Sequence, residues 1–98
     1  MYLVNITVNA DIDSTQHDEL FALHANWFKT QFELGKIVFA SPYVDMERAG
    51  VVIINTDNKD ELQAILELDS YYPNLASYDV RKISPTLIAK NFATLVGR

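Results

Sequence analysis

Residues 50–68 read GVVIINTDNKDELQAILEL. Residues 51–54 are an uninterrupted β-branched run, a composition that favours a β-strand. Asn58 and Glu61 then have the spacing of a capping box, in which each side chain accepts a hydrogen bond from a free backbone amide at the start of a helix. The apolar residues of that helix recur at helical spacing: Leu62, Ile65, Leu66 and Leu68. The stretch therefore predicts a strand followed directly by an amphipathic helix.

The N-terminal part of the chain repeats this strand–helix order. Residues 2–8 alternate, with Tyr2, Val4, Ile6 and Val8 on one face, as in a strand. Apolar residues then recur three and four apart, which predicts a helix over 14–34. Its start is capped by Asp13, Ser14 or Thr15, and it ends before Gly35, where a left-handed turn commonly closes a helix.

Further elements complete a known pattern. Residues 36–40 are expected to form a strand stopped by Ser41-Pro42, and residues 77–84 a strand ended by Pro85. A final helix is expected over 86–96. The order is βαββαβ plus a C-terminal helix, the split βαβ pattern of ferredoxin-like α+β folds. Residues 1–98 are expected to form a single domain, because 98 residues are too few for two.

Composition and charge argue against several classes of binding partner. The net charge is −5, from eight Lys and Arg against 13 Asp and Glu, and the basic residues are scattered. Nucleic-acid binding needs a basic stripe, so it is not expected. The chain has no cysteine for a disulfide or a thiolate metal site. It also has no apolar run near the ~20 residues that span a bilayer. We expect a cytoplasmic protein with no membrane partner.

The strands predict self-association. In this topology the first and third strands are central, and both helices cover one face of the sheet. Residues 51–54 are nevertheless apolar on both faces, and so are residues 36–40, with Ile37 and Phe39 on one face and Val38 and Ala40 on the other. The simplest arrangement is a homodimer with two sheets packed face to face around a twofold axis. The alternative is that the C-terminal helix of the same chain covers this face. The sequence is also compatible with a larger assembly in which two dimers join through their C-terminal helices.

His24 is the principal candidate for a reactive group. It lies on the apolar stripe with Leu20, Trp27 and Phe28, so it faces the sheet. If the two central strands are parallel, the helices that follow them run in the same direction. His24 lies ten residues past the start of the first helix, and Asp69 lies eleven residues past Asn58, at the start of the second. At ~1.5 Å per residue the two side chains lie at similar depth. Asp69 then accepts the Nδ1 proton of His24 and leaves Nε2 as a base.

Other interpretations of these residues stay open. His24 is a satisfied core histidine in one of them, and Asp69 a turn residue at the end of a helix. Trp27 is interpreted as core and His17 as a solvated surface residue. The two histidines are too far apart to bind one metal ion, and the three isolated glycines form no phosphate loop, so neither metal nor nucleotide cofactor is indicated. Tyrosines that either pack or line a pocket are Tyr43, Tyr71, Tyr72 and Tyr78.

Two segments resemble the YciI-like (YCII-related) proteins. They are residues 24–42, which begin with His24 and contain Gly35 and Pro42, and residues 69–85, which begin with Asp69. The resemblance as a whole covers residues 1–85. The resemblance implies a dimeric α/β barrel of ferredoxin-like subunits with a His–Asp pair in a cleft. At least one relative eliminates chloride from a chlorinated hydroxyquinol. This sequence departs from the pattern at Ser41, where glycine is usual, and at Ser70, where proline is usual.

The resulting hypothesis is a cofactor-free lyase or isomerase acting on a small cyclic or hydroxylated substrate. His24 serves as the base and Asp69 orients it. Ser41 or a tyrosine steadies the developing oxyanion, and the substrate contacts are assigned to Ser41, Tyr43, Tyr71 and Tyr72. Two alternatives remain: a non-catalytic dimeric module that binds a small molecule, and a dimer whose histidine only completes the core.

Overall fold

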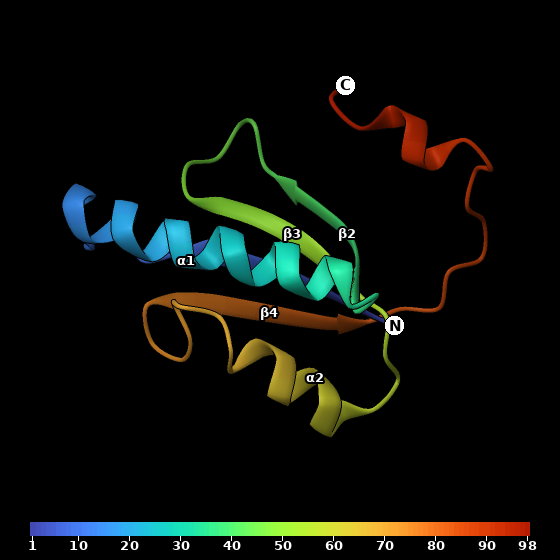
Figure 1. Cartoon of the computed structure of the whole chain (residues 1–98), viewed down its shortest axis with the longest axis horizontal. Helices are drawn as coiled ribbons and strands as arrows, with labels where there is room; N and C mark the ends of the chain where they lie inside the picture. Colours follow the sequence, from blue (N-terminus) through green and yellow to red (C-terminus); the bar gives the residue numbers. More distant parts are fainter.

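The computed structural model describes residues 1–98 as an α+β domain compatible with the ferredoxin-like fold (Figure 1). One sheet of four strands packs against two helices. The elements in chain order are β1 (Tyr2–Val8), α1 (Ser14–Glu33), β2 (Ile37–Pro42), β3 (Ala49–Ile54), α2 (Lys59–Leu66), β4 (Ala76–Lys82) and the short 3₁₀ helix η1 (Phe92–Leu95).

The strand directions correct one expectation. The sheet order is β2-β3-β1-β4, which places β1 and β3 at the centre as predicted. These two strands are antiparallel, however, with Tyr2 opposite Ile54 and Thr7 opposite Ala49. In a split βαβ pattern each helix connects two parallel strands, and the strand inserted between them runs the opposite way. The helices α1 and α2 therefore run in opposite directions (Figure 1), whereas the sequence analysis had them running the same way.

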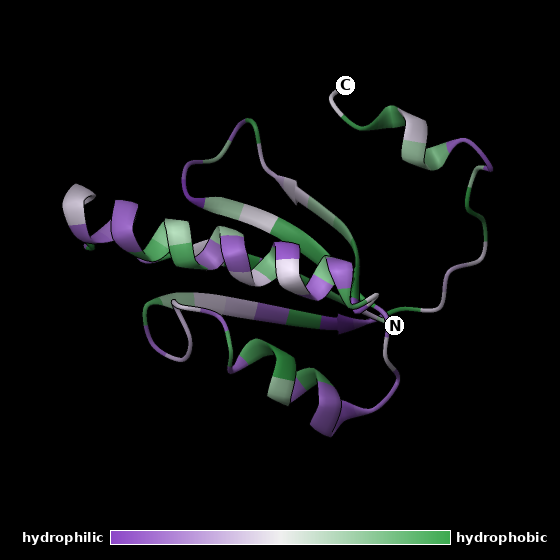
Figure 2. Cartoon of the chain, in the orientation of Figure 1, coloured by the Kyte–Doolittle hydropathy of each residue, from purple (hydrophilic) through white to green (hydrophobic).

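The core lies between the sheet and both helices. Alternate residues of β1 point into it, and Val4 and Ile54 are completely buried. Trp27 from α1 and Leu62 and Ile65 from α2 belong to the same buried cluster, so both helices cover one face of the sheet. The interpretation of Trp27 as core is confirmed. Figure 2 shows apolar and hydrophilic residues alternating around α1, as burial of one stripe requires.

Local signals fix both ends of α1. The side chain of Asp13 accepts a hydrogen bond from the amide of Gln16 at 2.9 Å, which identifies the cap among the three candidates. Gly35 has a φ of +78°. The amide of Lys36 donates to the carbonyl of Gln31 at 2.9 Å, and that of Gly35 to Phe32 at 3.0 Å. This pair of bonds is a Schellman motif, which needs the left-handed conformation that glycine adopts easily.

The start of α2 confirms half of the predicted capping box. Asn58 Oδ1 accepts from the amide of Glu61 at 3.0 Å. The prediction that Glu61 accepts from the amide of Asn58 is wrong, because that amide donates to Thr56 Oγ1 at 3.1 Å. Glu61 is free to reach Lys36 Nζ at 3.0 Å, and this ion pair joins α2 to the residue preceding β2.

The strand β2 differs from the prediction in length and in register. It continues through Pro42, which pairs with Gly50, because a proline is tolerated on an edge strand where its missing donor is not needed. An irregularity between Ile37 and Phe39 also shifts the pairing, so that Ile37 lies opposite Ile54 and Phe39 opposite Ile53. Ile37 and Phe39 therefore lie on opposite faces, contrary to the sequence analysis.

The C-terminal segment does not form the helix expected over 86–96. Only Phe92–Leu95 are helical, in a single 3₁₀ turn, and Figure 1 shows the segment leading away from the sheet. Phe92 stacks on Phe39 with ring centroids 5.6 Å apart. Leu87 and Val96 are 92% and 88% exposed. A short helix with no packed face is not stable by itself, and the segment does not fold back as a helix over the sheet.

The helices are also too short or too polar for a bilayer: none has the length and apolarity of a membrane span.

Candidate functional site

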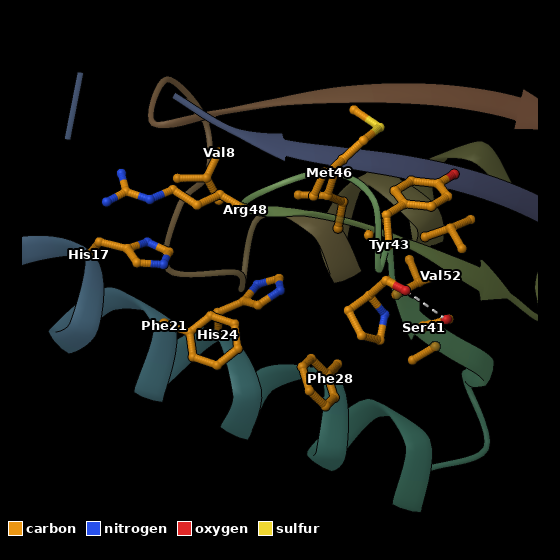
Figure 3. Close-up of a pocket in the computed structure, with 16 residues that line it drawn as sticks. Val8, His17, Phe21, His24, Phe28, Ser41, Tyr43, Met46, Arg48 and Val52 are labelled. Atoms are coloured by element: carbon orange, nitrogen blue, oxygen red, sulfur yellow. Dashed lines mark hydrogen bonds between the residues drawn. The ribbon is translucent and has the colours of Figure 1, made fainter. Parts of the chain in front are cut away.

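A pocket of about 400 Å³ lies between α1 and the β2–β3 half of the sheet (Figure 3). Residues 43–48, which connect β2 to β3, close one side of it. Ten of the sixteen lining residues are hydrophobic. Tyr43 is one of these ten, and the remaining lining residues with polar or charged side chains are His17, His24, Ser41 and Arg48. The volume lies in the range of small-molecule sites, which start near ~300 Å³.

His24 forms part of the pocket wall and is bonded from behind by Asp69. Its Nδ1 lies 2.6 Å from Asp69 Oδ1. The side chains are 14% and 0% exposed, respectively, so the carboxylate is completely buried while the imidazole keeps an exposed edge. The contact predicted between these two residues is confirmed. Asp69 does not border the pocket, so its contact with the pocket wall is through His24.

Tyr78 completes the environment of this carboxylate. Its hydroxyl donates to Asp69 Oδ2 at 2.6 Å, so both carboxylate oxygens are occupied. Burial raises the pKa of Tyr78, and the hydrogen bond to Asp69 raises this pKa further, so the hydroxyl remains a donor. A carboxylate accepts only, so Nδ1 of His24 is the donor in this bond, and in the neutral form of the ring the lone pair of Nε2 is free.

The contact between His24 and Asp69 arises from the antiparallel course of the chain beyond α2. Trp27 Nε1 donates to the carbonyl of Ile65 at 2.9 Å. Further along, Ser70 Oγ donates to the carbonyl of Leu20 at 2.7 Å. As residue numbers rise from 65 to 70, their partners on α1 fall from 27 to 20. Asp69 and His24 meet within this series, so the equal-depth argument reached the right pair from a wrong helix direction.

His17 belongs to the site, although the sequence analysis placed it on the solvated surface. It is half-buried, borders the pocket, and its Nδ1 lies 2.9 Å from Tyr71 Oη. Tyr71 is completely buried and packs edge-on against the His24 ring, with centroids 5.3 Å apart. Burial raises the pKa of Tyr71, and the charge of Asp69 adds to this rise. Tyr71 therefore supports both histidines, and it is not among the residues that line the pocket.

The other predicted substrate contacts are only partly in place. Tyr72 does not border the pocket, and its hydroxyl pairs with Gln63 of α2. Ser41 borders the pocket, but its Oγ donates to the carbonyl of Pro42 at 2.9 Å. Tyr43 also borders it, with its hydroxyl donating to Asn5. Asn5 alternates with the buried Val4 and Ile6, so this hydroxyl is directed to the open face of the sheet. None of these hydroxyls bonds to His24.

Arg48 is a site residue that the sequence analysis missed. Its backbone has a φ of +54°, a conformation uncommon for residues other than glycine. Its carbonyl accepts from the amide of Val8 at 2.9 Å, and its Nη1 donates to the carbonyl of Ile12 at 2.8 Å. These bonds attach the β2–β3 connection to the β1–α1 connection and place Arg48 at the pocket. Only the position of Arg48 in a polar linker was visible in the sequence, and that does not tell which residue faces inward.

No family model matches the chain, and comparison with curated proteins gives no match either. The features of the site are therefore those of the chain's own residues: a carboxylate-oriented imidazole, a neighbouring cation and an apolar cavity.

Proposed function

We propose that this chain is a cofactor-free lyase or isomerase in which His24 removes a proton from a small cyclic or hydroxylated substrate. The observation that carries the proposal is the 2.6 Å contact between His24 Nδ1 and the buried Asp69, at the wall of a pocket of about 400 Å³. The resemblance of residues 24–42 and 69–85 to YciI-like proteins, in which such a pair occupies a cleft, favours the same function.

Each residue of the pair has a distinct part. Nε2 of His24 accepts the substrate proton, which makes the ring an imidazolium. Asp69, already bonded to Nδ1, stabilises that cation without taking the proton itself. Tyr78 holds the carboxylate in place from the other side. General-base catalysis of this type contributes about 10²–10⁴-fold to a rate.

The apolar walls supply the binding surface for a ring. Phe21 and Phe28 of α1 pack around His24, with centroid distances of 5.9 and 5.5 Å to its imidazole. Val52 of β3 and Met46 of the β2–β3 connection also border the pocket (Figure 3). An apolar pocket favours a flat or cyclic substrate over a strongly hydrated one.

Proton exchange tests the reaction without knowledge of the natural substrate. A panel of small cyclic ketones, lactones and hydroxylated rings is incubated with protein in D₂O, and deuterium incorporation at carbon is followed by NMR. We expect the wild type to exchange at least one compound and His24→Gln to lose this exchange. Asp69→Asn should slow it, whereas the exposed Asp79→Asn serves as the matched control and should not.

Two outcomes would contradict the proposal. Exchange by His24→Gln at the wild-type rate would remove His24 from the reaction. Binding of panel compounds without any exchange would favour the non-catalytic binding module instead.

Self-association is the second part of the proposal, and it concerns the open face of the sheet. Leu3, Phe39 and Ile53 share this face, because Ile53 pairs with both of the others. Each is only half-buried in the single chain. Burying an aliphatic side chain completely contributes about 1.5–3 kcal/mol, so a second copy packed here stabilises both sheets. A face-to-face homodimer is also what the YciI-like resemblance implies.

Light scattering coupled to gel filtration tests this part. We expect a mass of twice the 11.1 kDa chain for the wild type and for Leu23→Glu, whose side chain is exposed on α1. Ile53→Glu should give the single-chain mass with an unchanged circular dichroism spectrum. A monomeric wild type at the highest concentration measured would rule the dimer out.

A further inference from the structure

The pocket differs in charge from the rest of the molecule. The chain carries 13 acidic and eight basic residues, yet no Asp or Glu is among the sixteen residues that line the pocket. Its ionisable lining groups include Arg48, His17 and His24. Asp69, the carboxylate behind His24, already accepts hydrogen bonds from Tyr78 and His24. The pocket of an acidic protein is thus neutral to positive.

Arg48 is held in place before any ligand arrives. Its Nη1 donates to the carbonyl of Ile12, and its own carbonyl accepts from the amide of Val8. One nitrogen is therefore used to fix the guanidinium, while Nη2 and Nε make no hydrogen bond with the protein. A guanidinium fixed in this way binds a planar oxyanion with little further loss of side-chain freedom.

The polar and apolar parts of the lining are separated. In Figure 3, Arg48 and His17 lie toward one end of the pocket, Phe28 and Val52 toward the other, and His24 lies between them. A ligand that satisfies both ends has one anionic group and an apolar body. One permanent cation suits a monoanion, and the pocket lacks the glycine-rich backbone cradle that phosphate groups use.

We propose that the pocket binds a small monocarboxylate with an apolar ring or chain, whose carboxylate is held by Arg48 and whose body contacts Phe21, Phe28 and Met46. The assignment of the substrate class rests on the proposed function, because the same pose brings a carbon beyond the carboxylate to His24. Recognition of the carboxylate itself requires no turnover.

Matched pairs of small molecules test this recognition. Benzoate is compared with benzamide, and cyclohexanecarboxylate with cyclohexanecarboxamide, by ¹H–¹⁵N NMR titration of the full chain. The members of a pair have nearly the same shape and differ in charge. We expect each carboxylate to bind about tenfold or more tightly than its amide, as for a charged hydrogen bond. Arg48→Gln should abolish this preference. Arg81→Gln removes the same charge at an exposed site on β4 and should leave the preference intact.

Two further measurements keep the test decisive. If Arg48→Gln does not fold, Arg48→Lys and a salt series on the wild type replace it. Carboxylate affinity should then fall with ionic strength, while amide affinity stays constant. His24→Gln should lose deuterium exchange but keep the carboxylate preference, so a failure of the reaction is distinguished from a failure of the anion site. Equal binding of acid and amide, a preference that survives in Arg48→Gln, or no binding of either member would overturn the inference.

Discussion

Tyr78 donates a hydrogen bond to Oδ2 of Asp69 at 2.6 Å, on the carboxylate oxygen that His24 does not use. The three residues come from β4, from the turn after α2 and from α1. The orientation of the His24 ring is therefore set jointly by three elements that the sequence separates by up to 54 positions. Such a ring is held rigidly only when the whole domain is folded.

Removing the Tyr78 hydroxyl should destabilise the domain. In Tyr78→Phe the buried Asp69 Oδ2 loses its donor, which costs about 1–3 kcal/mol in the free energy of unfolding. Urea denaturation measures this cost. The control is Tyr43→Phe, whose hydroxyl is bonded to Asn5 at an exposed site, and whose loss should cost about 1 kcal/mol or less. An equal loss of unfolding free energy in the two variants would show that the Tyr78–Asp69 hydrogen bond contributes no more to stability than the exposed Tyr43–Asn5 bond.

The tautomer of His24 is a second observable. With Asp69 accepting from Nδ1, the neutral ring should carry its proton on Nδ1 and leave Nε2 unprotonated. Ring nitrogen chemical shifts report this directly in long-range ¹H–¹⁵N spectra. In Asp69→Asn the preference should weaken, because the amide side chain can donate as well as accept. A wild-type ring protonated mainly on Nε2 would refute the proposed base.

Stability should fall at alkaline pH. The pKa values of Tyr71 and Tyr78 are both raised, first by burial and then by Asp69, so the folded state keeps protons that the unfolded chain loses above about pH 10. This contribution is fully present below pH 10 and is lost as the pH rises beyond it. Urea midpoints between pH 8 and pH 11 measure the decline. The double variant Tyr71→Phe/Tyr78→Phe should decline less steeply, and an unchanged slope would contradict the assignment.

Two glycines should be sensitive to alanine for different reasons. A Cβ on Gly50 would lie 2.8 Å from the carbonyl oxygen of Ser41, so β2 and β3 would have to separate, at a cost of about 1–3 kcal/mol. Gly35 has open space around it but a φ of +78°, which costs alanine roughly 1–2 kcal/mol. Because Gly50 borders the pocket, only Gly50→Ala should also weaken benzoate binding. Unchanged binding in that variant would place the pocket elsewhere.

The cap of α2 gives a further test. Asn58→Ala removes the acceptor for the amide of Glu61 and should cost about 0.5–2 kcal/mol. Asn55→Ala, at an exposed position just after β3, is the matched control and should be nearly neutral. Thermal unfolding of the two variants gives the comparison, and equal melting temperatures would mean that Thr56 supports the helix start without Asn58.

The sequence predicted those parts of the fold that depend on local patterns. Alternation identified β1, Gly35 identified the end of α1, and the order of elements identified the central strands. The directions of β1 and β3 depend on how the crossovers are connected, so a pattern within one segment did not reveal them. The helix expected over 86–96 was wrong because its apolar residues pack against the chain at little more than the Phe92–Phe39 stack, and periodicity alone does not supply a packing partner.

The residues of the candidate site likewise fall into those that local sequence patterns predicted and those that they did not. His24 was found because a histidine on an apolar stripe must face the interior. Asp69 was reached by an equal-depth argument that assumed the wrong helix direction, and its contact with His24 instead follows from the antiparallel course of the two helices. His17 and Arg48 were missed. The exposure of His17 depends on Tyr71, a residue 54 positions away, and the inward direction of Arg48 depends on its left-handed backbone and its bond to Ile12. Neither contact can be predicted from the residues adjacent in the sequence.

The pocket lining and the Tyr78–Asp69–His24 chain are both drawn from one polypeptide. In the proposed homodimer, a subunit separated from its copy by dilution would keep every group named in the proposed reaction, so the turnover rate per chain should not vary with protein concentration. In a mixed pair made of one intact and one His24→Gln subunit, half of the turnover should survive.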